Sequence, residues 1–210
     1  MPTLLRIDSS PQTRSRSFSR QMTDEFVQQW LQKNPGGRVV TRDLAATSIA
    51  PLNAEWIAAS YTPRPSRDAK QVEVLKLSDE LIAELKTADE YVFGVAMHNF
   101  SIPSVLKLWI DQISRAGETY SYENGAAVGL LRGRKATFLV ASGGSYEAGS
   151  PRAAMNFVEP YLRSLFAFLG VTEIQVINAG GTGQARHGVA RETILQPAIA
   201  SIQGAFEAVG

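Results

Sequence analysis

The chain has 210 residues, of which 44% are hydrophobic and 20% are charged, and its 21 lysines and arginines nearly balance 20 aspartates and glutamates. This length and composition predict one globular domain spanning residues 1–210. The absence of cysteine excludes catalytic thiols, thiolate metal sites and disulfide frameworks. A net charge of +1 argues against a protein that mainly coats nucleic acid.

The beginning of the chain and its apolar runs favour a cytoplasmic protein. A charge at Arg6 interrupts the segment that would form a signal-peptide core. The longest apolar run, Tyr91–Met97, is far shorter than the ~20 residues that a helix needs to cross a bilayer. We therefore expect no contact with a membrane and a cytoplasmic location.

Short apolar or β-branched runs alternate along the chain with segments of helical period. The runs that predict strands are Thr3–Asp8, Val39–Asp43, Glu90–Met97, Lys135–Ala141 and Glu173–Asn178. The apolar stripes that predict helices begin at Phe18, Val74, Val105, Tyr161 and Ile194. Five such repeats predict an α/β three-layer sandwich, with a five-stranded parallel sheet of order 2-1-3-4-5 and helices on both faces.

Two insertions interrupt this alternation. The segment Ala45–Asp68 contains three prolines and a short helical stretch near Glu55–Tyr61. The segment Glu118–Leu131 contains Asn124-Gly125, which predicts a two-residue hairpin turn.

The loop Ser9–Ser17 connects the first predicted strand with the first predicted helix and carries five hydroxyl groups and two arginines. The free N–H groups and the dipole of a helix N-terminus attract anions, so we predict a phosphate site. The alternative is helix capping, for which one serine suffices. The loop has neither the glycines of a dinucleotide fingerprint nor a Gly-Lys-Ser/Thr ending, so a single terminal phosphate fits better than a pyrophosphate.

Two further loops leave the carboxyl ends of the central strands, where open α/β sheets bind ligands. Met97–Pro103 offers a thioether, an imidazole, an amide and an aromatic ring, which suit a planar heteroaromatic cofactor; ordinary core packing is the alternative for Met97 and Phe100. Ala141–Ser145 contains Gly143 and Gly144, whose backbone can approach a ligand closely.

Other chemistries find less support in the sequence. Ser142 lacks the first glycine of a hydrolase elbow, because Val140 stands there. The run Gly180–Gly183 follows the fifth predicted strand rather than the first, so we interpret it as a flexible loop and not as a dinucleotide site. His98 has no accompanying cluster of ligand residues, and no metal is expected.

Taken together, the loops resemble the FMN-dependent NADH-azoreductases, also described as NADH:quinone oxidoreductases, of the flavodoxin-like fold. The resemblance covers essentially the whole chain. It rests on Arg42–Leu44, Leu77–Ile82, Met97–Phe100, Lys107–Asp111, Arg115–Gly117, Glu123–Ala126 and Leu131–Lys135. The chain departs from the family at His98, where a tyrosine is usual, and at Ala141-Ser142, where Ser-Arg is usual.

The resemblance implies a bound FMN, with NADH or NADPH as the co-substrate. Its implied cofactor contacts are Ser10, Ser15, Arg16 and Ser17 at the phosphate, Met97, His98, Asn99 and Phe100 beside the isoalloxazine, and Ala141, Ser142, Gly143 and Gly144 at its polar edge. It implies two-electron, ping-pong reduction of quinones, azo compounds and nitroaromatics. No side chain is identified as an obligatory acid or base, although His98 is a candidate proton donor.

The family's homodimers with shared active sites imply that a partner copy completes the pocket. Phe100, Tyr120 and Trp56 are candidate pocket residues, and the Glu118–Leu131 insertion is a lid, an interface element or a plain surface hairpin. Two alternatives remain: a non-enzymatic flavodoxin-type electron carrier, which is usually strongly acidic, and a flavin-free binding module.

Overall fold

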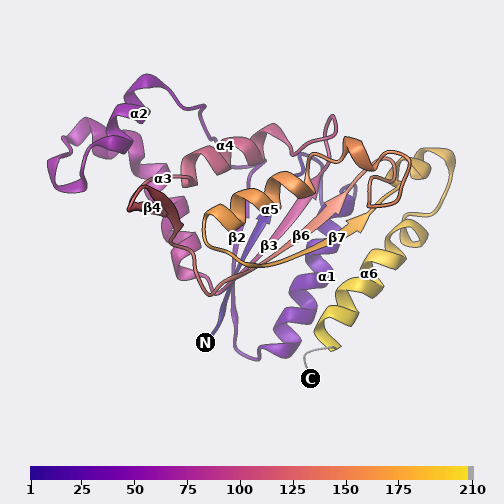
Figure 1. Ribbon diagram of the computed structural model, residues 1–210. Helices are drawn as coiled ribbons and strands as arrows, with labels where there is room; N and C mark the ends of the chain where they lie inside the picture. The colour runs from indigo at the N-terminus through magenta and orange to yellow at the C-terminus, as the bar shows by residue number, and fades with distance from the viewer. Residues whose placement is uncertain (208–210) are drawn as a thin grey trace.

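The structure is a computed structural model that describes residues 1–207, and its centre is a parallel sheet of five strands (Figure 1). The strands are β1 (Thr3–Asp8), β2 (Arg38–Asp43), β3 (Glu90–Ala96), β6 (Lys135–Ala141) and β7 (Glu173–Ala179). Their order is β2-β1-β3-β6-β7, and every neighbouring pair is parallel. The predicted fold class and the order 2-1-3-4-5 are therefore confirmed.

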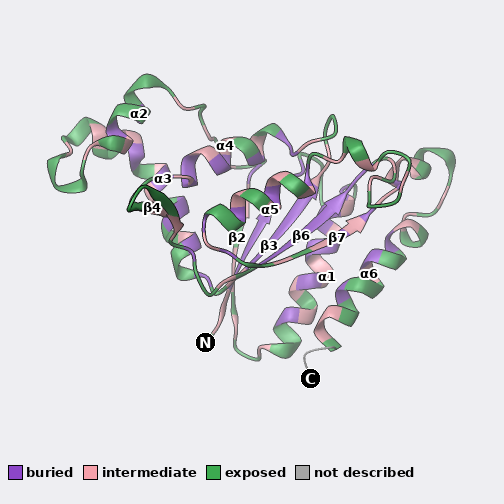
Figure 2. Cartoon of the chain, in the orientation of Figure 1, coloured by how far each residue is buried: buried purple, intermediate pink, exposed green. Residues whose placement is uncertain are grey.

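Helices cover both faces of this sheet. Helices α1 (Phe18–Lys33) and α6 (Arg191–Glu207) cover one face, and α3 (Ala69–Thr87), α4 (Ser104–Ile113) and α5 (Glu159–Phe168) cover the other. Successive strand residues divide between the two cores: Leu4 packs with α1 and α6, whereas Leu5 belongs to the opposite cluster. The central strands are buried on both faces (Figure 2), as their continuous apolar runs predict.

Both insertions form the local structure that their sequences favour. The first contains α2 (Ala54–Tyr61) and the short 3-10 helix η1 (Arg64–Ser66), and together they project beside α3 (Figure 1). The second is a hairpin of β4 (Tyr120–Glu123) and β5 (Ala126–Gly129). Asn124 and Gly125 have φ values of 51° and 81°, the conformation of a type I′ turn. The predicted hairpin turn is therefore confirmed.

The hairpin docks next to the amino ends of β6 and β7, on the side of the sheet that α5 covers. The Leu131 N–H donates to the Leu169 carbonyl at 2.8 Å, just beyond the end of α5. The Tyr120 ring packs on Phe168 with 4.8 Å between the ring centroids. Among residues 1–207, no helix is long and apolar enough to cross a membrane.

Candidate functional site

Three loops meet at the carboxyl edge of the sheet, because their strands are parallel neighbours. Ser9 donates to the Gly94 carbonyl from its N–H at 3.0 Å and from its hydroxyl at 2.8 Å, which joins the ends of β1 and β3. The Met97 N–H donates to the Ala141 carbonyl at 2.8 Å and joins β3 to β6. The structure thus brings together all three loops that the sequence analysis selects, at the point where the strand order reverses.

The Ser9–Ser17 loop presents hydrogen-bond donors at the N-terminus of α1. The Ser17 hydroxyl caps the helix by accepting from the Arg20 N–H at 3.3 Å. Within residues 1–207, the N–H groups of Ser15, Phe18 and Ser19 have no acceptor. Ser15 and Arg16 are both exposed. Capping therefore uses one serine and leaves a set of donors that suits an anion.

The loop after β3 contains a strained turn that sequence rules do not predict. His98 and Ser101 exchange backbone hydrogen bonds of 2.9 and 3.0 Å, and between them Asn99 and Phe100 have φ values of 48° and 70°. Asparagine tolerates this left-handed conformation, but phenylalanine rarely adopts it. Strain of this kind gathers at ligand sites. Both N–H groups of the turn lack an acceptor in residues 1–207, and the Phe100 ring is 38% exposed.

The loop after β6 turns its carbonyls inward and its N–H groups outward. The carbonyls of Gly143 and Gly144 accept from the N–H groups of Gly183 and Gly181, both at 3.1 Å, whereas their own N–H groups have no acceptor in residues 1–207. A Cβ at Gly143 would meet nothing within 4 Å, so this backbone is open to a ligand. The Thr182 N–H and hydroxyl both donate to the Ser142 carbonyl at 3.0 Å.

The Gly180–Gly183 run is therefore not the flexible loop that we expected from its sequence. Its residues Thr182 and Gly183 begin the 3-10 helix η3 (Thr182–His187), and the run braces the loop after β6. This role cannot be predicted from the local sequence, because the partner residues Gly143 and Gly144 lie about forty positions earlier in the chain.

Two other residues at this edge escaped the sequence analysis. Tyr146 packs against Phe100 with 6.0 Å between the ring centroids. Gly94 lies under the first loop, where an added Cβ would come within 2.9 Å of the Asp8 carboxylate and 3.2 Å of the Ser19 carbonyl. An isolated glycine within a buried strand indicates such a close approach, and this signal could have identified Gly94.

Two of the candidate pocket residues lie away from the three loops. Trp56 is 7% exposed, packs with Ala59 and Leu75, and donates its indole N–H to Gln112 at 2.8 Å. Its satisfied donor and its burial make it part of a small core beneath α2 rather than a wall of the candidate site. Tyr120 lies on the hairpin near the amino ends of the strands. Phe100 alone of the three candidates lies at the carboxyl edge.

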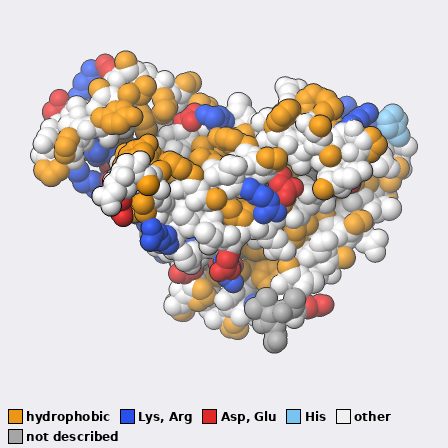
Figure 3. Space-filling view, in the orientation of Figure 1, with side chains coloured by type: hydrophobic (Ala, Val, Ile, Leu, Met, Phe, Trp, Pro, Cys, Tyr) orange, Lys and Arg blue, Asp and Glu red, His pale blue; other side chains and the backbone are white. Residues whose placement is uncertain are grey.

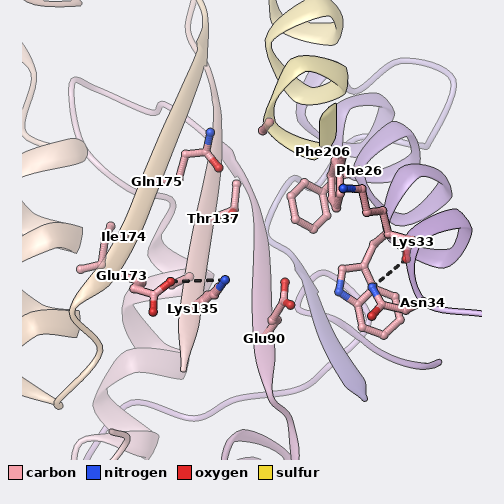
Figure 4. A pocket seen from close by; sticks show the side chains of 13 residues that line it. Phe26, Lys33, Asn34, Glu90, Lys135, Thr137, Glu173, Ile174, Gln175 and Phe206 are labelled. Carbon is pink, nitrogen blue, oxygen red and sulfur yellow. Dashed lines mark hydrogen bonds and ion pairs between the residues drawn. The ribbon is translucent and has the colours of Figure 1, made fainter. Parts of the chain in front are cut away.

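A cavity of about 450 Å³ lies at the opposite edge of the sheet (Figure 4). Its floor comes from the first residues of β3, β6 and β7, namely Glu90, Lys135 and Glu173, and Phe26 and Phe206 approach it from α1 and α6. Lys135 and Glu173 form an ion pair of 3.4 Å, whereas the neighbouring Glu90 carboxyl forms no ion pair within residues 1–207. Burial raises the pKa of Glu90, against the opposing effects of Lys135 and Trp30.

We expect Glu90→Gln to stabilise the protein at neutral pH. A raised pKa means that folding favours the protonated carboxyl, so the contribution of Glu90 to stability is greatest at low pH and declines as the pH rises through its raised pKa. Glutamine keeps the neutral shape, so the melting temperature should rise by roughly 2 °C at pH 7 and stay unchanged near pH 4. Glu173→Gln, which breaks an exposed ion pair, is the control. A melting temperature of Glu90→Gln equal to or below the parent's at pH 7 would contradict this prediction.

Residues 1–207 contain no group of three or more histidine, cysteine or acidic side chains arranged to hold a metal ion.

Comparison with known proteins places the chain among flavodoxin-like proteins. A family described as having the flavodoxin-like fold matches residues 2–203. An FMN-dependent NADH:quinone oxidoreductase of Acidobacterium capsulatum is 52% identical over 97% of this chain and 98% of its own length. FMN-dependent NADH:quinone oxidoreductase 3 of Burkholderia lata is 44% identical over the same shares of the two chains.

Solved structures agree with this assignment. An FMN-dependent NADH-azoreductase of Bacillus anthracis, solved in complex with FMN, has 25% identity and a TM-score of 0.87 over 100% of this chain and 99% of its own. An azoreductase of the same species has 24% identity and a TM-score of 0.88 over 98% of this chain and 99% of its own. A likeness at this level of identity shows the fold alone. On the family match and the identity to these relatives, the chain belongs to the flavodoxin-like fold family and is an oxidoreductase related to the FMN-dependent NADH:quinone oxidoreductases.

Proposed function

We propose that this protein binds FMN at the carboxyl edge of the sheet and uses NADH or NADPH to reduce quinones and azo compounds. The observation that carries the proposal is the meeting of three loops whose outward N–H groups lack acceptors in residues 1–207. The printed names of the relatives supply the cofactor and the class of reaction. Nitroaromatics are a further acceptor class, because they too are flat and apolar and take electrons.

The Ser9–Ser17 loop would hold the phosphate of FMN. The hydroxyls of Ser10, Ser15 and Ser17 and the guanidinium of Arg16 are the nearest donors by position, and the N-terminus of α1 adds its dipole. The donor set fits a phosphate, because it combines the exposed Ser15 hydroxyl, the Arg16 cation and N–H groups that have no acceptor within residues 1–207. The Ser10 and Ser17 hydroxyls are buried beside them. Asp24, the nearest acid on α1, is already paired with Arg6 and Arg14.

The other two loops would hold the isoalloxazine ring. Met97–Phe100 offers an apolar side and, at the strained turn, two unpaired N–H groups. Ala141–Gly144 offers the N–H groups of Gly143 and Gly144, which can stabilise negative charge on the ring's polar edge. His98 is exposed at the same turn and is a candidate proton donor.

Bound FMN would supply hydride transfer from the nicotinamide and two-electron reduction of the acceptor, and we expect a ping-pong scheme in which the two substrates would use the same face in turn. The protein's part is to bind the cofactor and the substrates, to orient them and to exclude water from the site. Phe100 and Tyr146 form an aromatic pair, with Tyr146 against Gly144 and next to the open backbone position of Gly143, and a flat acceptor would stack there.

Initial rates with NADH and benzoquinone, each varied at several fixed concentrations of the other, test this proposal. Parallel double-reciprocal lines are expected. Intersecting lines would overturn the ping-pong scheme. Tight FMN binding without turnover would favour the electron-carrier alternative, and failure to bind FMN would favour the flavin-free module.

We also infer that the protein is a homodimer with shared active sites. Several aromatic side chains are exposed in the single chain, including Tyr61 (77%), Tyr122 (66%) and Phe157 (59%). Hydrophobic side chains gather over the α2 segment and the hairpin (Figure 3), and an apolar surface of this kind marks an interface. Light scattering should give twice the chain mass of 22.8 kDa; a monomer at micromolar concentration would contradict the inference.

A further inference from the structure

We propose that Arg20 is a positioning residue for the Ser9–Ser17 loop, holding it in the conformation that accepts a phosphate group. The proposal rests on the proposed function, because it assigns a role toward the phosphate of FMN. Arg20 is absent from the sequence-predicted contacts.

Arg20 contacts both ends of the loop. Its guanidinium donates to the Ser10 carbonyl from Nη2 at 2.7 Å and from Nε at 3.3 Å. Its backbone N–H donates to the Ser17 hydroxyl at 3.3 Å. One residue of α1 therefore fixes where the loop starts and where it ends.

The guanidinium is itself held in place. Arg20 is 9% exposed, and its Nη1 and Nη2 donate to the two carboxylate oxygens of Asp43 at 2.8 and 2.7 Å. Asp8 lies 3.6 Å away and is fixed by Arg6 and by the Thr23 hydroxyl, each at 2.8 Å. The bidentate pair of Arg20 with Asp43 connects the end of β2 to the loop after β1. Lysine cannot reproduce this pair with one ammonium group.

The direction of the Ser10 carbonyl explains why the contact with the Arg20 guanidinium matters for binding an anion. Ser10 is 2% exposed, so its carbonyl oxygen needs a buried donor. The next residue is Pro11, which has no N–H, so this peptide offers only a negative end. Arg20 keeps that end pointing into the protein. Without the guanidinium, the buried carbonyl loses its donor and has to turn toward water, which would expose a negative end within the loop that would bind the phosphate.

The experiment compares FMN with riboflavin, which lacks the phosphate. Flavin-free full-length protein is titrated with each ligand, and the ratio of the riboflavin Kd to the FMN Kd measures the contribution of the phosphate site. Arg20→Met and Arg20→Lys are the test variants. Arg42→Met is the matched control, because Arg42 is also partly buried on β2 and paired with Glu80 and Glu84, yet it does not contact the loop.

We expect Arg20→Met to lower the Kd ratio by about tenfold or more, the effect of losing hydrogen bonds from a charged donor. The Kd ratio of Arg20→Lys should lie between those of Arg20→Met and the parent. The lysine variant also keeps the proposal testable if Arg20→Met does not fold. Arg42→Met should lower the melting temperature and leave the ratio unchanged. A parent-like ratio in Arg20→Lys and Arg20→Met, or an equal loss of affinity for both flavins, overturns the proposal. A parent that binds neither flavin overturns the proposed function itself.

Discussion

Gly129→Ala is expected to lower the melting temperature by roughly 8 °C, corresponding to about 3 kcal/mol, because it forces the hairpin away from the end of α5. A Cβ at Gly129 would lie 2.1 Å from the Gly170 nitrogen and 2.3 Å from the Leu169 carbonyl carbon. Both are backbone atoms, so no rotamer change relieves the clash. Gly170 cannot move aside freely, because its φ of 100° already requires glycine.

Thermal melting of Gly125→Ala provides the control for this prediction. Gly125 has a φ of 81° at the tip of the same hairpin, but a Cβ there would meet nothing within 4 Å. Gly125→Ala should therefore lower the free energy of unfolding by only about 1 kcal/mol, the cost of placing alanine in a left-handed backbone conformation. If the two variants melt at the same temperature, the contact between Gly129 and Gly170 does not hold the hairpin in place.

Ser15→Asp is expected to weaken FMN binding by tenfold to about a hundredfold while leaving the fold intact. Ser15 is exposed in the middle of the loop that would bind the phosphate. A carboxylate at this position adds a negative charge to the loop that would bind the phosphate, and like charges repel even in a solvated setting. Flavin titration followed by fluorescence measures the change.

Two controls isolate the charge effect in Ser15→Asp. Ser15→Ala removes the hydroxyl without adding charge and should weaken binding much less. Riboflavin, with no phosphate, should bind the aspartate variant as well as it binds the parent. If the aspartate variant binds FMN as the parent does, the phosphate does not lie at this loop.

The fold could be predicted because its signals are local. The strands Thr3–Asp8 and Lys135–Ala141 have the predicted bounds, since short runs of mainly apolar or β-branched residues mark buried parallel strands. The strand predicted to end at Met97 ends at Ala96. Met97 still donates to Ala141, but the chain then turns toward the tight turn at Asn99 and Phe100.

The meeting of the three loops could also be predicted, because the carboxyl ends of parallel strands share one edge. What the sequence does not reveal is how each loop is fixed. Phe100 adopts a left-handed conformation that propensity argues against. Arg20 on α1 depends on Asp43, which lies 23 positions further along the chain, at the end of β2. From the sequence alone, Trp56 could line a pocket or belong to a core. The structure shows the second, because Gln112 accepts its indole N–H.

Absorbance of the FMN-loaded protein during anaerobic addition of NADH tests whether the carboxyl-edge loops form a working flavin site. Flavin bands are expected at about 370 and about 450 nm. The longer-wavelength band should bleach with one equivalent of NADH and return when benzoquinone is added. A bound flavin that NADH leaves oxidised, or a protein that binds no FMN when it is supplied, would contradict the assignment of the carboxyl-edge loops as a flavin site for hydride transfer.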